Sequence, residues 1–103
     1  MTPAQGEVWW AETDERKRRP VLVVTRSHAV PVLNAILVAP VTRTVRNVST
    51  EIPLDEQSGL REPCVASFDN LQRVSRGALT ERVGSLAQPH RAICRALAAL
   101  ADC

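Results

Sequence analysis

The chain has 103 residues, a net charge of +2 and 45% hydrophobic residues, with only three aromatic side chains. A chain of this length is expected to form one domain over residues 1–103, whose core buries roughly 65% of the unfolded surface and is marginal without a partner. The apolar content argues against disorder, and the longest apolar run is too short to span a membrane.

Three strands are predicted in the first half of the chain. Residues 6–12 contain the aromatic and β-branched run Val8-Trp9-Trp10, which is typical of a strand. Residues 21–25 are mostly apolar without interruption, which indicates burial on both faces. A third strand is predicted over 35–42, where Pro40 indicates an edge or a bulge near the strand end. A hairpin-type connection and an irregular loop are expected between them, at residues 13–18 and 27–33.

The second half continues the β pattern. Residues 48–54 alternate between apolar and polar side chains and predict a half-exposed strand, which a turn at 57–59 follows. Residues 64–68 predict a fifth strand, and the polar segment 69–73 comes after it. Residues 82–86 favour a short sixth strand.

The C-terminal segment changes its hydrophobic period. After Pro89, which suits a first helical position, the apolar residues Ile93, Ala96, Leu97 and Leu100 fall on one helical face. Five to six short, mainly antiparallel strands closed by one helix predict a mostly β fold, a small curled sheet or barrel.

The charge is unevenly distributed along the sequence. Residues 16–50 contain seven basic side chains and no acidic one, whereas the rest of the chain has six basic and eleven acidic residues. This uneven distribution of charge is typical of a protein whose first half contacts an anionic partner. A solvated basic face gives the same pattern, and charge alone does not separate the two.

The three cysteines form no C-x-x-C pair and no zinc-ligand spacing with His28 or His90. Their odd number, with no secretory signal in the sequence, is typical of the reducing cytoplasm. We therefore expect a cytoplasmic protein without a disulfide scaffold, a metal site or a cofactor.

Three motifs, in order and with compatible spacing, resemble the MazF/PemK-family toxins. Residues 6–10 and 19–24 are similar to the opening of the family. That opening is Gly-acidic-apolar-aromatic-aromatic, followed by Arg-Pro and an apolar run. The third-strand ending is similar to Ala39-Pro40-Val41-Thr42, with a compatible arginine-to-threonine spacing. A later strand ending is similar to residues 64–73. Residues 82–84 and the final helix match more weakly.

This resemblance implies an SH3-like barrel with a C-terminal helix, acting as a homodimer. It implies a type II toxin–antitoxin endoribonuclease of the mRNA interferase type. Such a toxin cleaves single-stranded RNA at short sequences without metal, leaving a 2′,3′-cyclic phosphate and a 5′-hydroxyl, and so inhibits translation and growth. The implied partner is an antitoxin with a flexible acidic tail that covers the RNA site.

Two features depart from the family pattern. The connection between Trp10 and Arg19 is shorter than the usual first loop and carries Arg16-Lys17-Arg18 in place of a Gly/Ser-rich stretch. Asn70 stands where glutamine is common. Closure of the active site and choice of the cut sequence are the properties that these changes affect.

The candidate catalytic residues are Arg19 and Thr42. Attack by a 2′-hydroxyl builds charge on a pentacoordinate phosphorus, and a guanidinium can donate two N–H bonds to its oxygens. Thr42 would donate its hydroxyl to the same phosphate from across the groove. Because arginine is effectively always protonated, its expected role is charge stabilisation, and the general base stays open, with His28 the titratable candidate.

Candidate RNA contacts surround this pair: Arg16, Lys17, Arg18, Thr44, Arg46, Asp69 and Asn70. Arg46 is expected to contact phosphate, and Asp69 and Asn70 base edges, although an Asp-Asn pair after a strand is also ordinary turn chemistry. His90 is expected on the surface of the last helix. Trp9 and Trp10 must point to opposite faces, so one is core and the other is a base platform or an interface residue.

Two other functions remain open from the sequence. The same fold family includes non-catalytic toxins that bind DNA gyrase through an aromatic-bearing tail, whereas this sequence ends Ala101-Asp102-Cys103. A bare RNA-binding module of SH3-like type would explain the basic stretch but not the pairing of Arg19 with Thr42.

Overall fold

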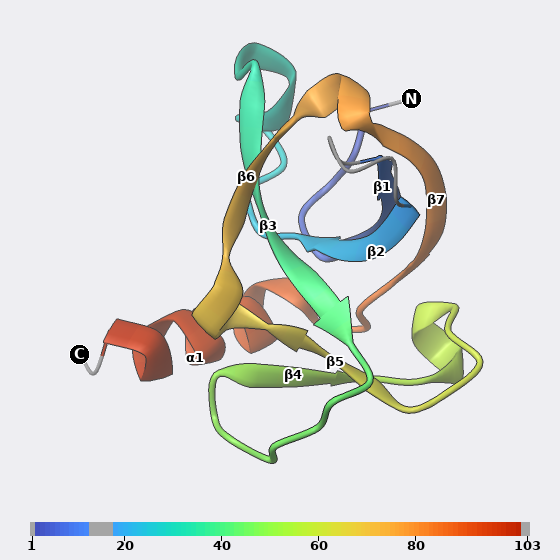
Figure 1. Ribbon diagram of the computed structural model, residues 1–103. Helices are drawn as coiled ribbons and strands as arrows, with labels where there is room; N and C mark the ends of the chain where they lie inside the picture. The colour runs from blue at the N-terminus through green and yellow to red at the C-terminus, as the bar shows by residue number, and fades with distance from the viewer. Residues whose placement is uncertain (1, 13–17, 102–103) are drawn as a thin grey trace.

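The computed structural model describes residues 2–12 and 18–101 and consists of one curled antiparallel sheet with a helix packed against it (Figure 1). The main path of the sheet runs β4-β5-β3-β2-β1-β7, and β6 pairs with β3 beside this path. The strands are β1 (Glu7–Glu12), β2 (Arg18–Val23), β3 (Ala35–Thr42), β4 (Glu51–Leu54), β5 (Cys64–Ser67), β6 (Gln72–Ser75) and β7 (Leu79–Ser85). The helix α1 spans Pro89–Ala101. The predicted mostly β fold with a C-terminal helix is confirmed.

The strand β3 is the centre of the sheet. It pairs with β2 on one side, and on the other side with β6 through residues 35–38 and with β5 through residues 41–42. Pro40, which cannot donate a ladder hydrogen bond, lies where β3 changes from one neighbour to the next. The sheet curls at this point, because β5 and β4 leave in a different direction from β6 (Figure 1).

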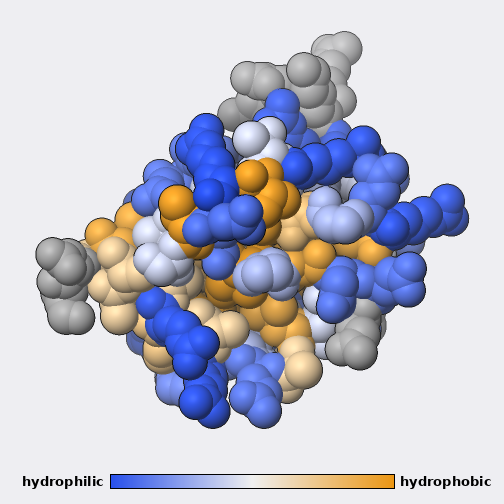
Figure 2. Space-filling view, turned by 90° about the horizontal axis from the view of Figure 1, so that it is seen from below, coloured by the Kyte–Doolittle hydropathy of each residue, from blue (hydrophilic) through white to orange (hydrophobic). Residues whose placement is uncertain are grey.

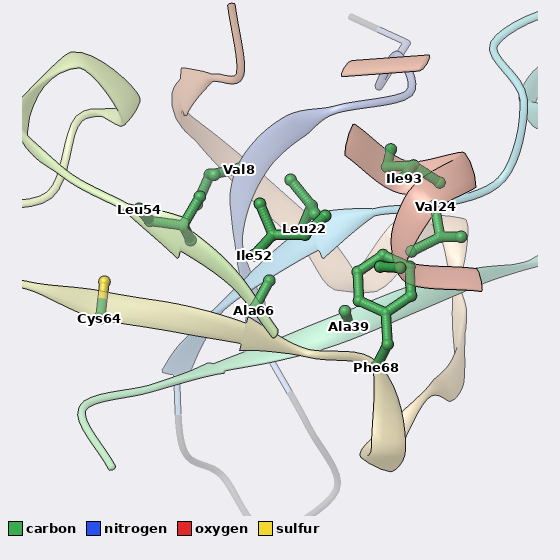
Figure 3. Close-up of a cluster of buried hydrophobic side chains, with 11 residues drawn as sticks. Val8, Leu22, Val24, Ala39, Ile52, Leu54, Cys64, Ala66, Phe68 and Ile93 are labelled. Carbon is green, nitrogen blue, oxygen red and sulfur yellow. The ribbon is translucent and has the colours of Figure 1, made fainter. Parts of the chain in front are cut away.

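The core has two parts, one on each face of the sheet. The larger part contains Val8, Leu22 and Phe68 and is covered by α1 through Ile93 and Ala96 (Figure 3). The other part contains Trp9 and its neighbours on β2 and β3. The uninterrupted apolar run of the second strand is explained by this arrangement, since its alternate side chains enter opposite halves of the core.

Several element bounds differ from those predicted. β2 begins at Arg18 and ends at Val23, whereas the prediction ran over 21–25. β4 begins only at Glu51, because residues 48–50 form a turn. β6 and the first part of β7 were not predicted, because their side chains are mostly polar and exposed.

Large apolar side chains also reach the surface. Among the described residues, these are Val32, Leu33, Val45, Val48 and Leu100. The face seen from below shows apolar groups between charged ones, over α1 and the β4–β5 region (Figure 2). Within residues 2–12 and 18–101, helix length and hydropathy do not reach what a membrane-crossing helix needs.

A close backbone approach fixes β7 against the segment before β5. A Cβ atom on Gly84 would overlap the carbonyl oxygen of Ser58, which is backbone and cannot move aside. Gly77, in contrast, has only a serine hydroxyl at 3.8 Å from such an atom and does not have a positive φ.

We predict that Gly84→Ala lowers the free energy of unfolding by about 1–3 kcal/mol, the usual cost of overpacking. Gly77→Ala, the matched control, should change it by no more than about 0.5 kcal/mol. Urea titration followed by circular dichroism measures both. Equal stability of the two variants would contradict the close approach.

The carboxylate of Glu7 ties the chain start to β1 and β7 at one end of the sheet. Its Oε1 accepts hydrogen bonds from the backbone N–H of Ala4 at 2.7 Å and from the indole of Trp9 at 3.1 Å, and its Oε2 accepts one from Arg82 at 2.6 Å. Burial raises the pKa of this carboxyl, but the three donors outweigh burial and hold its pKa below the ordinary value of 4.5.

A depressed carboxyl pKa stabilises the folded state above the unfolded pKa, and this stabilisation is lost as the pH falls through the folded value. We predict that the wild type exceeds Glu7→Gln in free energy of unfolding by on the order of 1 kcal/mol above pH 5. The difference should shrink below about pH 4. Urea titrations between pH 3 and pH 7 test this, and a difference independent of pH would refute it.

Candidate functional site: a groove between the ends of two strands

Arg19 and Thr42 lie on neighbouring strands. Val21 pairs with Pro40 in the antiparallel β2–β3 register, and continuing that register by two residues brings Arg19 opposite Thr42. Both side chains line one hollow of about 660 Å³, which we call the Arg–Thr groove. Its other lining residues are Pro40, Val41, Arg43, Thr44, Arg46, Glu51, Ser67, Asn70 and Gln72. The structure therefore brings the two candidate catalytic residues together.

The hydroxyl of Thr42 is oriented by its own loop. Its oxygen accepts a hydrogen bond from the backbone N–H of Thr44 at 3.1 Å. The hydroxyl hydrogen is then left to donate, since one hydroxyl both accepts and donates. Arg19 is exposed at the start of β2. The pair can thus direct a guanidinium and a hydroxyl at one phosphate without breaking a bond of the sheet.

The groove is predominantly positive. Among its lining residues are the arginines at 19, 43 and 46 and one carboxylate, Glu51. Arg43 forms an ion pair with Glu62 at 3.2 Å, with 81% and 61% of the two side chains exposed. Such an exposed pair is weak and leaves Arg43 available to an anion.

Glu51 holds the loop between β3 and β4, which carries Arg43, Thr44 and Arg46 of the groove. Its Oε1 accepts the backbone N–H groups of Arg46 and Asn47, each at 3.0 Å. Asn47 has a φ of 57°, in the left-handed region that asparagine tolerates better than most residues. The carboxylate thereby fixes the turn between β3 and β4 and, with it, the position of Arg46.

Asp69 and Asn70 are part of the frame of the groove. The carboxylate of Asp69 accepts the Thr50 hydroxyl at 2.6 Å and does not line the groove. The Asn70 amide donates to the Ser67 hydroxyl at 3.0 Å, and its side chain borders the groove. That these two residues contact base edges stays a prediction.

Arg18 and the two tryptophans do not line the groove. Arg18 forms an ion pair with Glu81 at 3.1 Å, and its guanidinium lies 5.3 Å from the centre of the Trp10 ring. Arg16 and Lys17 lie outside the described residues. Of the two tryptophans, Trp9 is buried and Trp10 is half-buried, so Trp10 is the one that is accessible.

Neither histidine belongs to the groove. His28 follows the far end of β2 and accepts a hydrogen bond from Arg26 Nε at 3.3 Å, whereas Arg19 is at the start of that strand. Arg19 and Val23, the last residue of β2, are four residues apart, which is roughly 13 Å along an extended strand. His90 lies on α1, 3.6 Å from the Cys94 sulfur. In the part of the chain that the structure describes, no three His, Cys, Asp or Glu side chains converge as metal ligands would.

Sequence reasoning missed four groove residues: Arg43, Glu51, Ser67 and Gln72. Glu51 carried one signal, since it is the first acidic residue after the long basic stretch. Ser67 and Gln72 carried none, because ordinary strand positions have the same composition.

Comparisons with known proteins agree with this geometry. A model of the PemK-like, MazF-like toxins of type II toxin–antitoxin systems matches residues 4–101. The chain is 43% identical over 103 residues to the probable endoribonuclease MazF5 of Mycobacterium tuberculosis, covering 98% of this chain and 94% of that protein. It is 44% identical over 70 residues to the endoribonuclease MazF3 of the same organism, covering 68% of each.

The solved structures include one at substantial identity. The M. tuberculosis toxin MazF-mt6 is 38% identical and superposes with a TM-score of 0.83, covering 93% of this chain and 96% of that chain. The prediction of an endoribonuclease toxin is confirmed at the level of the family. The Arg–Thr groove lies on a fold that its relatives share, and the chain belongs to the PemK-like, MazF-like toxins of type II toxin–antitoxin systems.

Proposed function

We propose that this MazF-like toxin is a sequence-selective endoribonuclease that cleaves single-stranded RNA in the Arg–Thr groove without a metal ion. The single observation that supports it best is the placement of Arg19 opposite Thr42 in a groove of positive charge. Relatives named as endoribonucleases cover nearly the whole chain, which supports the same activity.

The proposed reaction is a transesterification by the 2′-hydroxyl of the RNA, which the groups in the groove can support. The 2′-hydroxyl gives up its proton as its oxygen attacks the adjacent phosphorus, the bond from phosphorus to the 5′-oxygen breaks, and the leaving 5′-oxygen takes up one proton, so that no net proton is consumed. A 2′,3′-cyclic phosphate and a 5′-hydroxyl result. Arg19 supplies the positive charge that stabilises the pentacoordinate phosphorus, and Thr42 donates its hydroxyl to a phosphate oxygen.

The cellular role proposed is growth inhibition through loss of translatable RNA in the cytoplasm. The proposed partners are an antitoxin whose acidic tail competes with RNA for the groove, and a second copy of the chain. The positive charge of the Arg–Thr groove supports the acidic partner, because an acidic peptide and an RNA backbone would compete for the same arginines. A solved relative at 22% identity is an endoribonuclease in complex with its cognate antitoxin.

The first test is incubation with a long single-stranded RNA in EDTA, followed by mapping of the fragment ends. Discrete cuts at a shared short sequence, with 5′-hydroxyl ends, are expected. Intact RNA in the presence of folded protein would overturn the proposal.

We predict that Arg19→Ala lowers the rate of cleavage by about 100–1,000-fold, the usual effect of removing one donor to a charged transition state. Arg26→Ala, an exposed arginine of the same basic stretch outside the groove, is the matched control and should cleave at nearly the wild-type rate. Thermal melting checks that both variants fold. Cleavage by Arg19→Ala at the wild-type rate would remove Arg19 from the mechanism.

Glu51 gives a second prediction, which separates a positioning role from proton transfer. Because both backbone N–H groups bind Oε1, a glutamine retains the acceptor that they need. We expect Glu51→Gln to keep kcat and to lower KM, since a negative charge leaves the groove. Glu51→Ala should lose about tenfold in kcat/KM, the effect of one lost loop anchor of about 1.4 kcal/mol.

Single-turnover and steady-state cleavage of one RNA substrate measure these constants. If Glu51→Gln lost kcat with an unchanged KM, Glu51 would be the proton acceptor and not a positioning residue.

A further inference from the structure

A second hollow adjoins the Arg–Thr groove. It has a volume of about 790 Å³ and shares the end of β3 with the groove through Val41, Thr42 and Arg43. Its remaining walls are largely apolar and include Trp10, Pro20, Leu60 and Val83. We call it the Trp10 hollow. A chain that crosses Thr42 in the groove can therefore place its next group in the hollow.

The ring of Trp10 is held in a defined orientation. The guanidinium of Arg18 lies over it at 5.3 Å from the ring centre, within cation–π distance. Glu81 on β7 forms an exposed ion pair with the same guanidinium at 3.1 Å. The half-buried indole is thus an oriented aromatic surface, unlike Trp9, which is 4% exposed and donates to Glu7.

A further wall of the hollow is built on backbone contacts between residues 58–59 and β7. Gly59 has a φ of 89°, and a Cβ atom there would overlap the backbone of Val83. Together with the contact between Gly84 and Ser58, this holds the segment that carries Leu60 directly on β7. The hollow is consequently a formed cavity with a fixed wall.

Positive side chains border the apolar walls. Arg43 and Arg61 line the hollow, and Glu62, the acidic lining residue, is engaged with Arg43 at 3.2 Å. Apolar and aromatic walls with a cationic border match a nucleotide, whose flat base is apolar on its faces and whose phosphate is anionic.

We propose that the Trp10 hollow is a base subsite, which takes one unstacked base of the RNA whose scissile phosphate lies between Arg19 and Thr42. This proposal rests on the proposed function, because the RNA reaches the hollow through the groove. Trp10 is a substrate-binding and specificity-determining residue, because its ring packs against the base and excludes water. It takes no part in bond cleavage, which is assigned to Arg19 and Thr42.

The test uses an RNA that contains the mapped cut site and carries a 2′-deoxyribose at the cleaved nucleotide, which removes the attacking hydroxyl. A series of these RNAs has an abasic residue at successive positions around the cut. With the wild type, one abasic position next to the cut should weaken binding about tenfold, as loss of one stacked base does. Trp10→Leu should bind the RNA that has all its bases about tenfold more weakly than the wild type does. In this variant, an abasic residue at the same position should not lower the affinity further.

Tryptophan fluorescence supplies an independent readout, because the chain has two tryptophans. Binding of the uncleavable RNA should quench the wild type and Trp9→Phe, but not Trp10→Phe. Trp10→Phe retains an aromatic ring and should recover part of the affinity that Trp10→Leu loses. Its melting temperature checks the fold.

Additive losses for Trp10→Leu and the abasic residue, or quenching that persists in Trp10→Phe, would overturn the subsite. So would a response of Trp10 to an acidic peptide but not to RNA, which would assign the hollow to a protein partner. These outcomes differ from failure of the proposed function, in which the wild type cuts no RNA at all.

Discussion

The change of neighbour along β3 is the constraint on which the rest of the molecule depends. β3 pairs with β2 along one edge and with both β6 and β5 along the other, and Pro40 lies between the residues that pair with β6 and those that pair with β5. Beyond Pro40 the β2–β3 ladder ends, whereas Val41 and Thr42 pair with β5 on the other edge. Thr42 and the start of β2 therefore border an open groove, and the core divides into the two parts on either face of the sheet.

The site is built mainly from backbone that the sheet has already fixed. Arg19 and Thr42 lie just beyond the last β2–β3 pair, Val21 with Pro40, and the register of that ladder brings them opposite each other. The more adaptable part is the loop after Thr42, which is held by Thr42, by Glu51 and by the bond between Thr50 and Asp69. A pair fixed by two strands beside an anchored loop separates the groups proposed for the chemistry from the more variable part of the groove.

The elements that the sequence predicted well are those with a strong hydrophobic period. The third strand was predicted with its observed bounds, and the apolar face around Ile93 and Ala96 identified the helix. β6 was missed because Gln72, Arg73 and Ser75 are exposed, and this strand exists only because β3 offers it an edge. The pattern also required Trp9 and Trp10 to face apart, but which of them is buried depends on the direction in which the sheet curls.

The pairing of β1 with β7 has a consequence for a toxin during its synthesis. A ribosome-bound chain that has reached residue 78 can pair β2 with β3 and oppose Arg19 to Thr42, since that contact is local in sequence. The outer edge of β1 stays open at that stage, and Trp10 lacks the wall that Val83 supplies. The proposed catalytic pair is therefore assembled before the proposed base subsite, which is complete only when the distant strands β1 and β7 meet.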